Sequence, residues 1–130
     1  MSSNNKDATF LLFDIGRWDY TQRTIDYFKT QFEVEYVKGD SNKTLATYKP
    51  TKTYDLIHID GGHGVKTCEN DIMNCKKFSK SDTLLLVDDT NFKRLRVLLN
   101  DMVETHFLEE VEMESLDLET NRYHRLFTYC

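Results

Sequence analysis

Four side chains that could bind a metal ion or carry a proton follow two apolar segments of the sequence. They are Asp60, His63, Asp88 and Asp89. Carboxylate oxygens are the usual ligands of hard divalent cations. An imidazole with an ordinary pKa of about 6.5 can act as a base near neutral pH. Together the four residues indicate a hard-metal or acid–base site.

The two apolar segments, residues 56–59 and 83–87, have the length and composition of strands buried in a parallel sheet. Between them, residues 65–78 place apolar side chains at helical spacing, which predicts a crossover helix. Ligands of open parallel sheets bind beyond the carboxyl ends of the strands. We therefore expect both acidic loops to lie at one edge of the same sheet.

The remaining segments predict further alternating strands and helices. In order, we expect a strand at 8–13, a helix at 20–32, a strand at 33–37, a short helix at 42–48, a helix at 91–107 and paired strands at 108–118 and 123–129. Thr21 is the expected N-cap of the first helix. The sum is an α/β fold: a Rossmann-like, doubly wound and mostly parallel sheet with a C-terminal antiparallel hairpin.

The composition narrows the class of protein. The 130 residues suit one domain, expected at 8–130 after a polar, disordered tail at 1–7. A net charge of −5 argues against nucleic-acid binding, and no apolar run is long enough for a membrane span. Cys68 and Cys75 lie roughly 10 Å apart along a predicted helix, too far for a disulfide. We expect reduced thiols in a cytoplasmic protein.

A family resemblance rests on the two strand ends taken together. Residues 54–63 read Tyr-Asp-Leu-Ile-His-Ile-Asp-Gly-Gly-His, and residues 84–90 read Leu-Leu-Leu-Val-Asp-Asp-Thr. This pair resembles the class I S-adenosylmethionine-dependent methyltransferases, closest to the O-methyltransferase group with a D-G-x-H motif, related to the macrocin and catechol enzymes. The resemblance implies metal-assisted O-methyl transfer to a hydroxylated small molecule.

The resemblance also implies roles for individual residues. Asp60, Asp88 and Asp89 match positions that hold a divalent cation, usually Mg²⁺, and His63 matches the proposed base. On the cofactor side, the resemblance implies S-adenosylmethionine contacts from Asp14, Asp40, Ser41 and Asp60. The alternative is structural: Asp60 and Asp88 would cap the following helices, His63 would bond a loop carbonyl, and Asp14 and Asp40 would be ordinary turn residues.

One departure from the family pattern concerns the start of the chain. The family has a first strand and a glycine-rich loop, whereas Arg17-Trp18-Asp19 follow Gly16 here. We therefore expect a fragment or a shortened relative that lacks the first strand. The strand at 10–13 would then move beside the strand at 56–59 in a six-stranded sheet. Alternatively, two copies would pair through exposed strand edges as a homodimer.

Two other classes of function compete with the enzyme. A catalytically inactive remnant would keep the methyltransferase fold as a binding or assembly module. A receiver-like or phosphoryl-transfer domain would also bind Mg²⁺ at acidic strand ends. The second class is weakened because a receiver carries its acidic pair after the first strand, whereas Asp88 and Asp89 come late.

Overall fold

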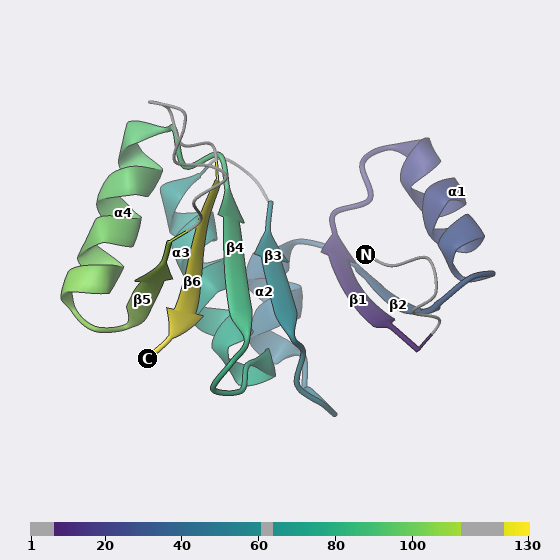
Figure 1. Cartoon of the computed structure of the whole chain (residues 1–130). Coiled ribbons are helices and arrows are strands. Elements are labelled where there is room, and N and C mark those ends of the chain that lie inside the picture. The colour runs from purple at the N-terminus through teal and green to yellow at the C-terminus, as the bar shows by residue number, and fades with distance from the viewer. Residues whose placement is uncertain (1–6, 61–63, 113–123) are drawn as a thin grey trace. The chain divides into compact units, whose positions relative to one another are not determined.

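The computed structural model describes residues 7–60, 64–112 and 124–130. The chain divides into two compact units, of which the first ends at Tyr48 and the second begins at Lys49. Each unit has its own sheet and its own helices (Figure 1). The expected tail at 1–7 lies outside the described residues except for Asp7.

The first unit consists of two parallel strands and two helices. In chain order these are β1 (Thr9–Asp14), α1 (Asp19–Phe28), β2 (Glu33–Lys38) and α2 (Ser41–Thr47). The register places Asp14 opposite Lys38, so both strands end at the same level. Exposed and half-buried residues alternate through most of β2, as its sequence predicts. Ile25 of α1 and Leu45 of α2 are the buried apolar side chains of the two helices.

The ends of α1 differ from the sequence-based prediction. The helix begins at Asp19 and its N-cap is Trp18, so the predicted cap at Thr21 is wrong. The Thr21 N–H instead donates to the Trp18 carbonyl at 3.1 Å. Asp19 explains the earlier start, because a carboxylate in the first turn interacts favourably with the positive end of the helix dipole. The helix ends at Phe28, and the next residues form turn hydrogen bonds, from the Thr30 N–H to the Tyr27 carbonyl and from the Gln31 N–H to the Phe28 carbonyl.

The second unit is a four-stranded sheet with two helices. Its elements are β3 (Leu56–Ile59), α3 (Val65–Cys75) with the 3₁₀ turn η1 (Lys76–Phe78), β4 (Leu84–Asp88), α4 (Lys93–Glu104), β5 (Leu108–Val111) and β6 (His124–Tyr129). The strand order is β3-β4-β6-β5. β3 and β4 are parallel, whereas β6 is antiparallel to both β4 and β5. The predicted crossover helix and the antiparallel ending are both present (Figure 1).

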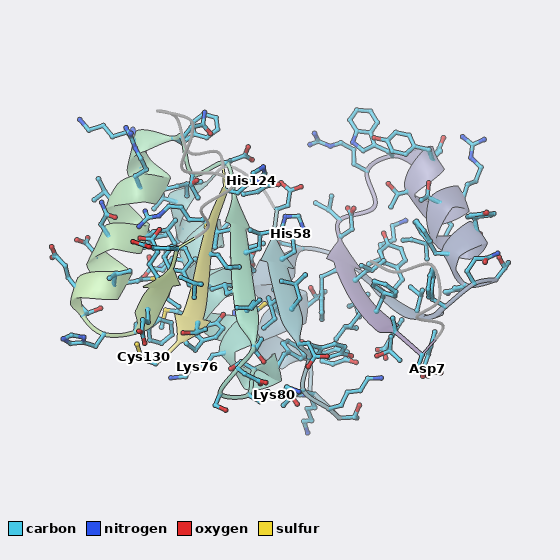
Figure 2. The ribbon with its side chains drawn as sticks, viewed as in Figure 1. Asp7, His58, Lys76, Lys80, His124 and Cys130 are labelled. Atoms are coloured by element: carbon cyan, nitrogen blue, oxygen red, sulfur yellow. The ribbon has the colours of Figure 1, made fainter. Side chains whose placement is uncertain are left out.

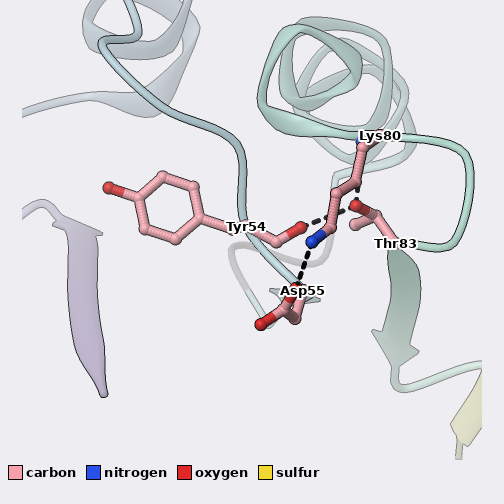
Figure 3. Close-up of polar contacts among 4 residues, drawn as sticks. All are labelled: Tyr54, Asp55, Lys80 and Thr83. Carbon is pink, nitrogen blue, oxygen red and sulfur yellow. Dashed lines mark hydrogen bonds and ion pairs between the residues drawn. The ribbon is translucent and has the colours of Figure 1, made fainter. Parts of the chain in front are cut away.

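Hydrogen bonds hold the starts of β3 and β4 together (Figure 3). The buried Thr83 hydroxyl donates to the Tyr54 carbonyl at 2.6 Å and accepts from the Lys80 N–H at 2.9 Å. The Lys80 ammonium lies 2.7 Å from a carboxylate oxygen of Asp55, and the Leu84 N–H donates to the Asp55 carbonyl at 3.0 Å. These contacts set the register of the two strands at their N-terminal ends.

One face of the four-stranded sheet forms the core of the second unit. Side chains alternate between the two faces of a strand, and the buried set is Ile57, Ile59, Leu85, Val87, Leu108 and Phe127. The helices bury Ile72 of α3 with Leu95 and Leu99 of α4. On the other face, Leu56 and Leu84 remain exposed. His58 and Asp88 belong to that second face by the same alternation.

The described strands form two hydrogen-bonded sheets, one in each unit. β1 pairs with β2, and β3 pairs with β4, in both cases in parallel. The six-stranded sheet expected from the sequence requires β1 beside β3, a contact between the two units, and stays a prediction. Within the described residues, no helix is long and apolar enough to cross a membrane.

Candidate metal centre

The ends of β3 and β4 bring two of the predicted carboxylates together. The parallel register pairs Ile59 with Val87, and this carries Asp60 level with Asp88 one residue further on. Side chains two residues apart in a strand lie on the same face. His58 therefore occupies the same face as Asp60, next to the end of β4.

Three side chains converge closely enough to share one ion. One ligand atom from each of His58, Asp60 and Asp88 lies within 4.8 Å of the other two. His58 Nε2 is 3.4 Å from Asp88 Oδ2, which makes an ion pair when the imidazole is protonated. His58 and Asp60 are exposed, whereas the Asp88 side chain is 16% exposed. The cluster is thus anchored at Asp88 and reachable from solvent at the other two residues.

A second histidine lies on the other side of Asp88. His124 begins β6 and is the antiparallel partner of Asp88. Its Nδ1 contacts Asp88 Oδ1, and both atoms are buried. The contact lacks hydrogen-bond geometry, and neither atom has another hydrogen-bond partner in the described part of the chain. Asp88 therefore sits between two imidazoles, and Figure 2 shows both histidines at the same end of the sheet.

Asp89, the third carboxylate predicted for the site, is not part of this cluster in the described residues. Asp89 follows the end of β4 with a φ of 58°, a left-handed conformation that turns the chain, and its carbonyl accepts from the Phe92 N–H at 3.2 Å. Its carboxylate is not among the converging ligand atoms of the described residues. His63 lies outside the described residues, so its predicted role as a base stays a prediction.

The alternative in which the two carboxylates cap helices finds no support in the geometry. The N-cap of α3 is Gly64 and that of α4 is Phe92, and neither helix has a side-chain cap at that residue. Asp60 and Asp88 lie before these positions. Neither carboxylate therefore serves as the N-cap of the helix that follows it.

In the first unit, the residues predicted to contact a cofactor make local contacts. Asp14 Oδ1 accepts from the Gly16 N–H at 2.9 Å, where Gly16 has a φ of 71°. Asp40 is the N-cap of α2, because its Oδ1 accepts from the Asn42 N–H at 3.0 Å. Ser41 is the first residue of that helix. The Gly39 N–H donates to the Asp14 carbonyl at 2.9 Å, which brings the ends of β1 and β2 together.

The sequence analysis predicted a role neither for His58, which belongs to the cluster, nor for His124, which contacts Asp88. His58 carried a usable signal, since a His-x-Asp spacing at a strand end puts two ligands on one face. His124 carried no local signal. Its contact with Asp88 depends on the antiparallel register of β4 and β6, which are separated in the chain by α4 and β5.

The fold is similar to those of solved methyltransferases. CalS11, a TDP-rhamnose 3′-O-methyltransferase of calicheamicin biosynthesis, has a TM-score of 0.65 at 12% identity, with 98% of this chain and 61% of CalS11 covered. The SAH-bound methyltransferase PaMTH1 of Podospora anserina has a TM-score of 0.63 at 10% identity, with 98% and 62% covered. This chain thus spans about six tenths of the length of either protein.

A third structure matches over more of its own length. The N-methyltransferase NodS of Bradyrhizobium japonicum has a TM-score of 0.53 at 12% identity, and the match covers 94% of this chain and 84% of NodS. At these identities the similarity is one of fold, and it confirms the predicted Rossmann-like α/β class. No curated protein sequence matches the chain significantly. Residues 2–90, however, match the methyltransferase domain family, and the chain belongs to that family.

Proposed function

We propose that the chain carries out S-adenosylmethionine-dependent, divalent-metal-assisted O-methyl transfer to a hydroxylated small molecule, as a member of the D-G-x-H group. One observation carries this proposal: in a methyltransferase-family chain, Asp60 and Asp88 converge with His58 at the C-terminal ends of two parallel strands. Ligands bind at this edge in open α/β sheets. The cluster thus has metal-ligating side chains at the edge of the sheet where a substrate would bind.

The donor set suits a divalent cation. Asp60 and Asp88 offer converging carboxylate oxygens. Asp89, the third carboxylate expected from the sequence, follows Asp88 in the chain. A bound cation would lower the pKa of an acceptor hydroxyl that it contacts. His63 would then accept the hydroxyl proton, since an ordinary histidine pKa allows this near neutral pH. The exposed faces of His58 and Asp60 leave room for an acceptor.

S-adenosylmethionine, when bound, would supply an electrophilic methyl group on a positively charged sulfur. Asp14 would accept hydrogen bonds from its ribose hydroxyls, and Asp40 with Ser41 would lie near the adenine. Asp60, which we expect to border the cofactor as well as the cation, would link the two sites. Support for the cofactor comes from the family match and from the SAH-bound relative PaMTH1.

Formation of S-adenosylhomocysteine tests this function directly. The chain is incubated with S-adenosylmethionine, MgCl₂ or MnCl₂, and a panel of hydroxylated acceptors that includes TDP-rhamnose, the substrate in the name of CalS11. We expect product with metal and a large loss when EDTA is added. Product that is unchanged by EDTA would leave methyl transfer standing and remove the metal from the mechanism.

The second candidate function is a catalytically inactive module for binding or assembly, with a homodimer through exposed strand edges as one form of assembly. It is favoured by the bulky residues that follow β1, where Trp18 is 57% exposed and Ile15 is 61% exposed. A cofactor loop needs small residues so that the backbone can approach the ligand closely. Calorimetric titration with S-adenosylmethionine separates the two candidates, because an inactive module of this kind gives no heat of binding.

A further inference from the structure

We propose that His58 is a metal ligand and that the site formed by His58, Asp60 and Asp88 prefers a first-row transition ion such as Mn²⁺ over Mg²⁺. This inference rests on the cation of the proposed function, but it concerns the identity of that cation and its nitrogen ligand. The three-aspartate site expected from the sequence contains oxygen ligands alone. Among the described residues, His58 and not Asp89 converges with Asp60 and Asp88.

The distances suit a single ion. Ligand atoms about 2.0–2.2 Å from a cation lie at most ~4.4 Å from one another. The nitrogen of His58 and the carboxylate oxygens of Asp60 and Asp88 already lie within 4.8 Å of each other. His58 and Asp60 are exposed, so small side-chain rotations can close the difference without disturbing the core. The site is therefore close to a ligating arrangement.

His124 is a positioning residue in this arrangement. Its Nδ1 contacts Asp88 Oδ1, while Asp88 Oδ2 is the oxygen nearer His58. Groups behind a ligating carboxylate fix its orientation and influence metal affinity. His124 thus holds Asp88 from behind, and the second oxygen of Asp88 is directed toward the shared site. His124 itself is not among the three converging ligands.

The chemistry of the ligands sets the metal preference. Mg²⁺ demands near-octahedral oxygen ligands and retains its waters, so an imidazole contributes little to its binding. Imidazole nitrogen suits transition ions, and carboxylates also suit Mn²⁺. Mn²⁺ is the best probe for the test because softer metal ions would also bind cysteine thiolates, whereas Mn²⁺ binds them poorly. Two of the three cysteines, Cys68 and Cys75, are also buried.

Pulsed electron paramagnetic resonance of the Mn²⁺-loaded chain tests the nitrogen ligand without any assay of activity. We expect ¹⁴N coupling in the wild type, its loss in His58→Gln, and its retention in His124→Gln. His106→Asn is the matched control: it removes an exposed imidazole elsewhere, and asparagine tolerates the φ of 61° at that position. Melting curves without metal verify that each variant is folded.

Calorimetry with MnCl₂ and MgCl₂ tests the preference. We expect Mn²⁺ to bind the wild type about tenfold or more tightly than Mg²⁺, and the difference to shrink in His58→Gln. A wild type without ¹⁴N coupling would overturn the inference, as would coupling that survives His58→Gln but is lost in His63→Gln. None of these outcomes depends on methyl transfer, so a failed transferase assay leaves the metal result intact.

Discussion

Aspartates follow strands in both units, but their side chains have different partners in each. In the first unit, Asp14 and Asp40 accept hydrogen bonds from backbone N–H groups two residues further along the chain. In the second, Asp60 after β3 and Asp88 at the end of β4 converge with each other and with His58 of β3. The carboxylates of the first pair have partners within two residues of the chain, whereas those of the second pair are brought together by tertiary structure.

The contrast shows how little an acidic residue at a strand end means by itself. A turn or helix cap needs a few consecutive residues, and aspartate serves it well. A convergent cluster requires two strands in register and several polar side chains held near one another. Neighbouring carboxylates repel each other, and a bound cation would offset that repulsion. Asp60 and Asp88 are thus the stronger candidates for a functional site.

The largest effect should come from disrupting the sheet that assembles the cluster. Leu85 of β4 is fully buried, and Leu85→Ala should lower the free energy of unfolding by about 2–5 kcal/mol through lost burial and a cavity. Denaturant unfolding measures the loss. The adjacent Leu84→Ala is the matched control, because its side chain is 37% exposed and should cost much less. Equal losses would contradict the assignment of the two faces.

Metal binding should separate the two pairs of aspartates. Mn²⁺ at 100 times its dissociation constant should stabilise the wild type by about 2.7 kcal/mol, because it binds the folded state alone. Asp88→Asn should abolish the rise in melting temperature, and so should joint replacement of Asp88 and Asp89. Asp14→Asn should keep it. A wild type that shows no rise at millimolar Mn²⁺ or Mg²⁺ would contradict the site.

Loss of the local cap in the first unit should have a smaller effect. Asp40→Ala removes the acceptor for the Asn42 N–H and should cost about 0.5–2 kcal/mol of stability. Asp40→Asn should be nearly neutral, because asparagine caps helices about as well. Thermal unfolding of both variants is the measurement. An equal loss in both would point to a need for charge at this position, as a cofactor contact requires.

Much of the fold was predictable because its signals are local. The apolar runs that form β3 and β4 lie within short segments of the sequence, and so does the helical spacing of α3. The convergence of Asp60 with Asp88 follows from the parallel register of the two strands. His58 was missed because it lies inside a run that was interpreted as core. Its exposed position emerges from the alternation with the buried Ile57 and Ile59.

Other features depend on contacts that consecutive residues do not encode. The pairing of His124 with Asp88 requires β6 to return beside β4. The six-stranded sheet, which needs β1 beside β3, stays a prediction, because strand edges can pair in more than one arrangement and the sequence pattern does not rank them. The predicted N-cap of α1 was wrong. Thr21 is a good cap by residue type, but Asp19 favours a first helical turn that begins before Thr21.

The smallest effect on stability should come from His63, which follows Gly61 and Gly62 in the acidic loop. His63→Ala should change the free energy of unfolding by less than about 1 kcal/mol, the scale of a surface substitution, because a base facing a ligand contributes little to the core. Production of S-adenosylhomocysteine should nevertheless fall steeply, since no group would accept the hydroxyl proton.

His106→Asn is again the control and should alter neither quantity. A stability loss of several kcal/mol would make His63 a structural histidine, and unchanged turnover would assign the base to another group. Full stability with lost turnover would support His63 as the proton acceptor of the proposed reaction.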